Sequence, residues 1–133
     1  MERRLAAILA ADMVGFSRQM QEDEVRTLEN LNLVRTMIVD PEVATHRGRI
    51  FKNTGDGFLA EFASAVDALN CARAIQEAIG LHNQPEIPGE QVVFRMGMNI
   101  GDIILENDDV FGDGVNIAAR LEPLAPPGGI VVA

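Results

Sequence analysis

The sequence predicts an α+β fold in which helices pack over a largely antiparallel sheet. Short β-prone runs and amphipathic helical segments follow one another along the whole chain, separated by turns rich in glycine and proline. Residues 92–100 place apolar side chains at every second position, which is typical of a strand with one face in the core. The expected order is strand, helix, strand, strand, helix, strand, strand, helix, strand, as in a ferredoxin-like sandwich.

The first half of the chain is expected to form a strand, one long helix and a hairpin. The strand spans Leu5 to Ala11, which is apolar at nearly every position, and the helix runs from Ser17 to about Val39. The runs Ile50–Asn53 and Phe58–Phe62 flank Thr54-Gly55-Asp56-Gly57, a segment typical of a tight hairpin turn.

The second half begins with an amphipathic helix that we expect to close at Gly80, followed by a loop from Leu81 to Gly89. The strand over 92–100 then leaves Arg95 and Asn99 on a polar, accessible face. The remaining elements are expected in this order: a turn at Gly101-Asp102, a strand over Ile103–Leu105, an acidic loop over Glu106–Asp109, a third helix from about Gly114 to Leu124, and a strand over Ile130–Ala133.

Composition indicates one acidic domain over residues 1–133. Acidic residues outnumber basic ones 20 to 11 and the net charge is −9, which disfavours binding to nucleic acid or to anionic membranes. The one cysteine, Cys71, excludes an internal disulfide and fits a reducing, cytoplasmic location. The N-terminal residues superficially resemble a secretory signal, but the apolar run is short and ends at Asp12, so we expect a soluble domain.

Asp12 and Asp56 are the strongest candidates for a functional site. Asp12 follows the first strand, and Asp56 lies in the hairpin turn. If the strand end and the turn are neighbours, two carboxylates converge, and a divalent cation relieves their repulsion. Oxygen ligands with room for water and phosphate suit Mg²⁺ or Mn²⁺. Each aspartate can also be explained singly, as a helix cap or a turn residue.

The turn Val14-Gly15-Phe16-Ser17 connects Asp12 to the start of a helix. Such a turn leaves backbone N–H groups free to bind phosphate. Ser17 is a reasonable N-cap for the helix, and capping alone would also explain its presence.

Four motifs together carry a resemblance to a known family. They cover residues 11–17, 52–58, 95–101 and 110–122, and the ending Pro127-Gly128-Gly129-Ile130-Val131 continues them. In this order they resemble the class III adenylate and guanylate cyclases over essentially the whole chain. The resemblance implies the class III nucleotidyl cyclase architecture. In the family, a final hairpin carries a second lysine that contacts the triphosphate, and the chain stops before it, at Ala133. We therefore expect a catalytic domain truncated at its carboxyl end. We expect the truncation to leave its activity in doubt and one sheet edge unpaired.

The resemblance implies that Asp12 and Asp56, with the Met13 carbonyl, bind two Mg²⁺ or Mn²⁺ ions. One ion would polarise the ribose 3′-hydroxyl for attack on the α-phosphate, and the other would hold the triphosphate and the departing pyrophosphate. The turn Val14–Ser17 would cradle phosphates, and Arg95 would contact the triphosphate. An ordinary surface ion pair is the alternative explanation for Arg95.

The resemblance also implies residues for the ribose, the α-phosphate and the base. Asn116 would orient the ribose, and Arg120 would stabilise charge growing on the α-phosphate. They are four residues apart, so both lie on one helix face, which solvent-facing residues would equally satisfy. Lys52 and Asp109 match the positions that donate to adenine N1 and accept from its N6 amino group, which favours ATP. Asp108 is adjacent to Asp109, and either acid could belong to a loop.

Sites in this family form between two subunits, and this chain has both sets of residues, so a homodimer in a head-to-tail arrangement is expected. The leading hypothesis is therefore an adenylate cyclase domain that forms cyclic AMP and pyrophosphate from ATP, attached to regulatory modules in a longer protein. A noncatalytic cyclase-like module that dimerises or binds nucleotide is the alternative, and guanylate cyclase activity is another. A diguanylate cyclase or polymerase-palm relative is more distant, because the Gly-Gly-Asp-Glu-Phe hairpin is absent.

Overall fold

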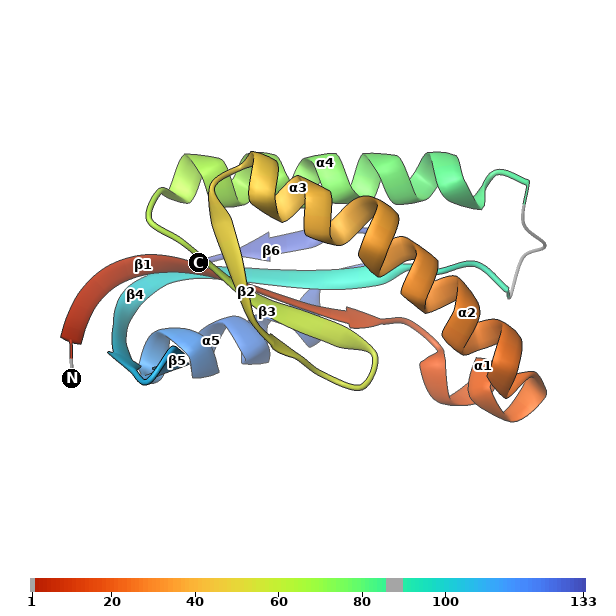
Figure 1. Cartoon of the computed structure of the whole chain (residues 1–133), viewed down its shortest axis with the longest axis horizontal. Helices are drawn as coiled ribbons and strands as arrows, with labels where there is room; N and C mark the ends of the chain where they lie inside the picture. The colour runs from red at the N-terminus through yellow and green to blue at the C-terminus, as the bar shows by residue number, and fades with distance from the viewer. Residues whose placement is uncertain (1, 86–89) are drawn as a thin grey trace.

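Six strands form one sheet that carries the candidate site at one end of its central strand (Figure 1). The computed structural model describes residues 2–85 and 90–133. The strand order is β2-β3-β1-β4-β5 with antiparallel neighbours, and β6 pairs in parallel with β4. The strands are β1 (Glu2–Met13), β2 (Gly48–Asn53), β3 (Gly57–Phe62), β4 (Phe94–Glu106), β5 (Asp109–Phe111) and β6 (Ile130–Val132).

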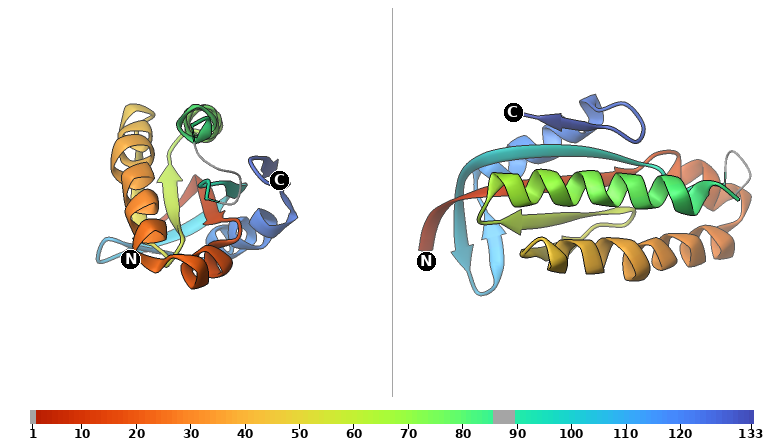
Figure 2. Two further views of the ribbon diagram at one scale, coloured as in Figure 1. Left: turned by 90° about the vertical axis from the view of Figure 1, so that its right-hand side faces the viewer. Right: turned by 90° about the horizontal axis from the view of Figure 1, so that it is seen from above.

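Helices cover both faces of this sheet. The long α4 lies beside the segment from α2 to α3 on one face, and α5 lies on the other (Figures 1 and 2). The helical elements are α1 (Phe16–Glu22), α2 (Glu24–Val34), the π-helix η1 (Arg35–Val39), α3 (Asp40–Thr45), α4 (Ala65–Asn83), α5 (Asp113–Leu121) and the 3₁₀ helix η2 (Glu122–Leu124).

Strand β1 is apolar on both faces because each face packs on a different core. Leu9 and its odd-numbered neighbours belong to the larger core under α2–α4, whereas Ile8 and its even-numbered neighbours pack with Ala118 of α5. The larger core also contains an edge-to-face contact of Phe58 and Phe94, with ring centroids 6.0 Å apart. A strand buried on both faces reads as a continuous apolar run, which explains the pattern before Asp12.

The element order predicted from the sequence and the α+β class are confirmed, but the first helix is not one continuous helix. It is interrupted at Asp23, whose side chain accepts a hydrogen bond from the Arg26 amide (3.0 Å) and caps α2. The helical structure then continues past Pro41 and ends at Thr45. Pro41 lies in the first turn of α3, directly after the π-helix η1, where a missing backbone N–H is tolerated, so the helical run does not end there.

Two boundaries in the second half are also wrong in the sequence analysis. No turn occurs at Gly101-Asp102, because β4 continues to Glu106 while pairing with the start of β1. The turn lies at Asn107 and Asp108, both with positive φ, and β5 occupies part of the expected acidic loop. Helix α4 ends at Asn83 rather than Gly80. Residues 86–89 of the expected loop lie outside the described part of the chain.

The alternation predicted that the face of β4 opposite the main core is accessible, and this prediction is wrong at Asn99. Asn99 is buried and donates to the Gly114 carbonyl (3.5 Å), and Gly97 contacts the backbone at Ala118 and Glu122. A Cβ on Gly97 would lie 2.4 Å from the Glu122 nitrogen, so only glycine lets α5 and η2 come this close. The carboxyl end of α5 and the start of η2 therefore lie close to the end of the sheet that carries Asp12.

Candidate functional site

Asp12 and Asp56 meet at the end of β1, as the sequence predicted. The register of β1 and β3 pairs Asp12 with Gly57, and the Met13 amide donates to the Asp56 carbonyl (3.1 Å). A Cβ on Gly57 would lie 1.7 Å from the Ala11 carbonyl oxygen and 2.7 Å from Oδ1 of Asp12. Glycine is therefore required at Gly57 for the hairpin to approach the first strand.

The electrostatics of this pair are those of acids placed close together. Burial raises the pKa of Asp12 above its ordinary value, and the neighbouring Asp56 carboxylate raises it further. The neighbouring side chains of Glu122 and Thr54 act in the opposite direction and lower the pKa of Asp12. Among the described residues, no ion pair joins Asp12 or Asp56 to a lysine or arginine. The two carboxylates are thus left to interact with a ligand.

Glu122 is a third acid at this site that the sequence analysis did not single out. Its side chain is buried, and burial followed by the Asp12 charge raises the pKa of Glu122 to about 7. Glu122 follows the buried Ala118 by four residues, whereas Asn116 and Arg120 share the other, exposed face. The four-residue spacing from Ala118 is the sequence feature that places Glu122 on the side of the helix that faces the sheet.

Arg95 lies opposite Asp12 in the register of β1 and β4. Its Nε donates to the Ala125 carbonyl (3.0 Å), and its charge lowers the pKa of Glu122. No ion pair joins Arg95 to an acid within the described residues, so the surface ion pair considered from the sequence is not formed.

The turn over Val14–Ser17 differs in detail from the prediction. Gly15, with φ of 70°, is the N-cap of α1, and Ser17 is the second residue of the helix, so Ser17 does not cap it. The Val14 amide donates to the Val93 carbonyl (2.7 Å) and is not free for a phosphate. The first-turn amides of Phe16 and Ser17 have no acceptor within the helix.

The remaining predicted residues lie around a second region. Lys52, Asp109 and Asn116 line one hollow of about 640 Å³, together with apolar side chains that include Leu59 and Val115. Leu59 also lines a smaller hollow of about 100 Å³ beside Asp12, so it lies between the two regions. Asp108 lines the larger hollow too, and the Asp109 carboxylate accepts from the Val110 amide (2.9 Å). Arg120 is exposed and does not line either hollow.

The donor set suits a divalent cation that completes its coordination from a substrate. No group of three or more His, Cys, Asp or Glu side chains in residues 2–85 and 90–133 is arranged to hold a metal ion by itself. Two carboxylates are available, and burial followed by the neighbouring Asp56 raises the pKa of Asp12. This matches Mg²⁺ or Mn²⁺, which use few protein carboxylates and take further oxygen ligands from phosphate and water.

Comparison with known proteins identifies the family. The family model described as the adenylate and guanylate cyclase catalytic domain matches residues 3–133. The chain belongs to this family. The cyclase domain is 51% identical over 131 residues to a Rhizobium meliloti protein named "Putative adenylate cyclase 3", and 34% identical over 136 residues to an adenylate cyclase of Streptomyces coelicolor. Each match includes 98% of the cyclase domain. The matched region is only 22% of the Rhizobium meliloti protein and 32% of the Streptomyces coelicolor protein.

Solved structures agree with this assignment. A crystal structure described as an adenylate/guanylate cyclase/hydrolase from Silicibacter pomeroyi superposes with a TM-score of 0.87 at 48% identity, covering 99% of the cyclase domain and 76% of that chain. The guanylyl cyclase Cya2 superposes with a TM-score of 0.84 at 24% identity, which shows the shared fold. Within the described residues, no helix is both long and apolar enough to cross a bilayer.

Proposed function

We propose that the chain is an adenylate cyclase catalytic domain that converts ATP to 3′,5′-cyclic AMP and pyrophosphate. The observation that carries the proposal is the convergence of Asp12 and Asp56 at the end of β1, with no arginine or lysine pairing them among the described residues. The 51% identity to the Rhizobium meliloti protein named for adenylate cyclase supports the choice of reaction.

In this reaction the ribose 3′-oxygen bonds to the α-phosphorus as the bond to the β-phosphate bridging oxygen breaks. The hydroxyl proton passes to solvent water, and pyrophosphate leaves with the bridging oxygen. Asp12, Asp56 and the Met13 carbonyl would hold Mg²⁺ or Mn²⁺, two ions per site as the family resemblance implies. Bound ions supply Lewis-acid polarisation of the reacting oxygens.

The residues of the chain divide the remaining work between the two regions. Arg95, beside Asp12, would contact the triphosphate. The Phe16 and Ser17 amides, in the turn over Val14–Ser17, would add hydrogen-bond donors for phosphate. Asn116 would orient the ribose, and Arg120 would neutralise charge that develops on the α-phosphate. Because Arg120 is exposed and lines neither hollow, we propose that it serves the site of a second subunit.

Base choice follows from the hydrogen-bonding groups at the larger hollow. Lys52 and Asp109 both line it, and so does Asn116. A lysine that donates to adenine N1 and an aspartate that accepts from the N6 amino group suit ATP, whereas guanine presents the reverse pattern. Each mismatch leaves a polar group without a partner, at about 1–3 kcal/mol.

The direct test is product formation by the purified domain, extended at its carboxyl end through the expected final hairpin, with Mn²⁺ and either ATP or GTP, resolved by chromatography and mass spectrometry. We expect cyclic AMP from ATP and at least about tenfold less cyclic product from GTP. Asp56→Asn, which keeps the size of the side chain, is the matched control without turnover. Nucleotide binding with no cyclic product would instead favour a noncatalytic module, and a preference for GTP would favour a guanylate cyclase.

The proposed homodimer has its own test. Asp56→Asn and Arg120→Ala impair different halves of the site, so a mixed dimer contains one site with neither change. Mixing the two inactive variants should restore about a quarter of the wild-type rate, since half of the dimers are mixed and each has one intact site. No restoration by the mixture would show that both sets of residues act within one chain.

A further inference from the structure

We propose that Arg35 is a positioning residue that holds the hairpin turn carrying Asp56 in place for cation binding, an inference that rests on the proposed function. Arg35 begins the π-helix η1, and its side chain reaches across to the turn between β2 and β3. Neither the motifs nor the hydrophobic pattern of the sequence pointed to it.

The contacts of Arg35 concentrate on the backbone of this turn. Its terminal NH2 group donates to the carbonyl oxygens of Thr54 (2.8 Å) and Gly57 (3.0 Å), and more distantly to that of Gly55 (3.4 Å). One nitrogen therefore contacts three of the four carbonyls around Asp56. Hydrogen bonds from a charged donor are shorter and stronger than those between neutral groups.

The fourth carbonyl of the turn is held from the other side. The Met13 amide donates to the Asp56 carbonyl (3.1 Å), and the Thr54 amide donates to the Gly57 carbonyl (3.1 Å). All four carbonyls of residues 54–57 thus have donors, from Arg35, from the end of β1 or from within the turn. With its backbone directed to these donors, the turn presents the Asp56 carboxylate to Asp12.

The local structure around Arg35 also indicates a positional role. Its Nε is buried and has no hydrogen-bond partner among the described residues, which is unfavourable for stability. A π turn is rare, and such turns occur often at functional sites. The wider turn starts at Arg35 itself, between two stretches of ordinary α-helix. A surface ion pair with a carboxylate would need neither feature.

The turn that carries Asp56 contains two glycines, which contribute no side-chain contacts. Gly55 and Gly57 flank Asp56, and a Cβ on Gly55 would meet nothing within 4 Å. The turn therefore has few side-chain contacts of its own to fix it, and backbone contacts must do so. Loss of the Arg35 contacts should let the Asp56 carboxylate move relative to Asp12 while the sheet stays intact.

Amide hydrogen exchange and Mn²⁺ binding test this in the 133-residue chain. In Arg35→Met, exchange should accelerate about tenfold or more at the Met13 and Thr54 amides, which close the turn. The Met96 amide, which donates to the Gly129 carbonyl at β4, should be unaffected and serves as the internal control. Mn²⁺ affinity, measured by electron paramagnetic resonance with the metal alone, should fall by about tenfold.

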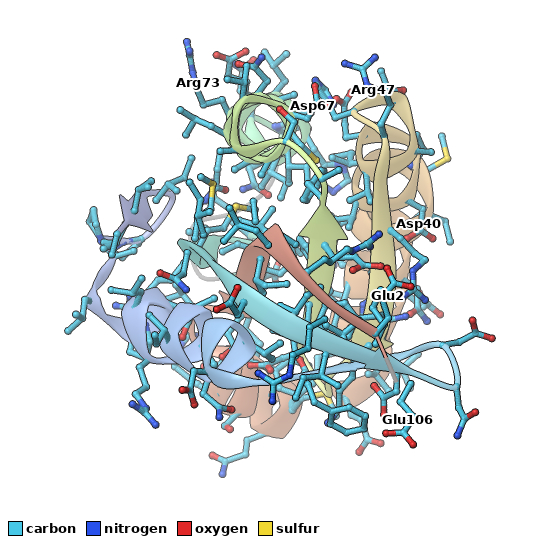
Figure 3. The ribbon with its side chains drawn as sticks, turned by 90° about the vertical axis from the view of Figure 1, so that its left-hand side faces the viewer. Glu2, Asp40, Arg47, Asp67, Arg73 and Glu106 are labelled. Carbon is cyan, nitrogen blue, oxygen red and sulfur yellow. The ribbon has the colours of Figure 1, made fainter. Side chains whose placement is uncertain are left out.

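Conservative variants separate positioning from general stability. Arg35→Lys keeps one charged nitrogen with three hydrogens and should hold Mn²⁺ affinity within about threefold of wild type. Arg35→Gln is too short to reach the turn, so it repeats the comparison if the methionine variant does not fold. Arg73→Ala, on the outer side of α4 away from the sheet, is the matched arginine control (Figure 3).

Three results would overturn the inference: unchanged exchange at Met13 and Thr54 in Arg35→Met, equal acceleration at Met96, or a lysine variant as impaired as the methionine variant. Neither exchange nor Mn²⁺ binding depends on turnover. Absence of cyclic AMP from the wild-type chain would therefore count against the proposed function alone, and the role of Arg35 would still be decided.

Discussion

The end of β1 around Asp12 and the hollow around Asn116 differ in how firmly a single chain holds them. At the first region, strand register pairs Asp12 with both Gly57 and Arg95, and Glu122 is buried beside it. At the second, Lys52, Asp109 and Asn116 are exposed around an open hollow. The first region is set by the fold of one chain, whereas the second is an exposed surface, which we propose is completed by substrate and by another subunit.

The largest expected effect on turnover comes from the region around Asp12 at the end of β1. Asp56→Asn removes one of the two converging carboxylates, so turnover should fall by at least about a thousandfold, because cation binding and charge stabilisation are lost together. The fold should be intact, which circular dichroism and thermal unfolding can check. A rate equal to wild type would remove Asp56 from the site.

The next effect concerns the exposed helix face. Arg120→Ala should lower kcat by about 100-fold or more, in the range for loss of one group that stabilises transition-state charge. Since Arg120 is exposed, thermal stability and Mn²⁺ affinity should equal those of wild type. Arg73→Ala is the control for loss of a surface arginine. Weaker Mn²⁺ binding in Arg120→Ala would mean that the two regions are not separate.

Base selectivity should change less, and only at the hollow. The double variant Lys52→Glu with Asp109→Lys reverses the donor and acceptor pattern, so the ratio of kcat/KM for ATP over GTP should fall by about 100-fold. Asp108→Asn is the neighbouring control, since Asp108 lines the same hollow. If the control shifts the ratio and the double variant does not, Asp108 takes the role proposed for Asp109.

The smallest expected effect is on the pH dependence of folding stability, and it comes from the buried Glu122. A Glu122 pKa raised to about 7 means that the metal-free fold gains stability from this group below its unfolded pKa near 4.5, and loses it as pH rises through about 7. Between pH 5 and 8 the metal-free chain should lose ~1 kcal/mol, or about 3–5 °C in Tm.

Glu122→Gln should flatten this pH dependence, because its side chain does not titrate. Saturating Mn²⁺ should reduce the dependence in the wild-type chain, because a cation favours the ionised acids. Differential scanning fluorimetry over the pH range, with chelator or with Mn²⁺, provides the measurement. A wild-type chain whose Tm rises with pH in chelator would contradict the assignment of Glu122.

Sequence patterns were sufficient for the order of the elements and for the convergence of Asp12 and Asp56. Glycine beside Asp56, the apolar run before Asp12 and the spacing of Asn116 and Arg120 are local features, so the α+β order, the converging aspartates and the shared helix face could be predicted. The family motifs added Lys52 and Asp109, which then proved to line one hollow. Each of these depends on residues near one another in the chain or on turn chemistry.

Features that depend on contacts between distant segments could not be predicted this way. Pairing with the start of β1 keeps β4 one continuous strand through Gly101, and the packing of α5 buries Asn99. Glu122 and Arg35 reach the site from elements remote from Asp12 and Asp56 in sequence. The local sequence pattern determined which segments are strands and helices and which acidic residues follow them. Only tertiary packing decided which segments pair and which side chains meet at the site, because burial and backbone hydrogen bonds are satisfied by contacts across the whole fold.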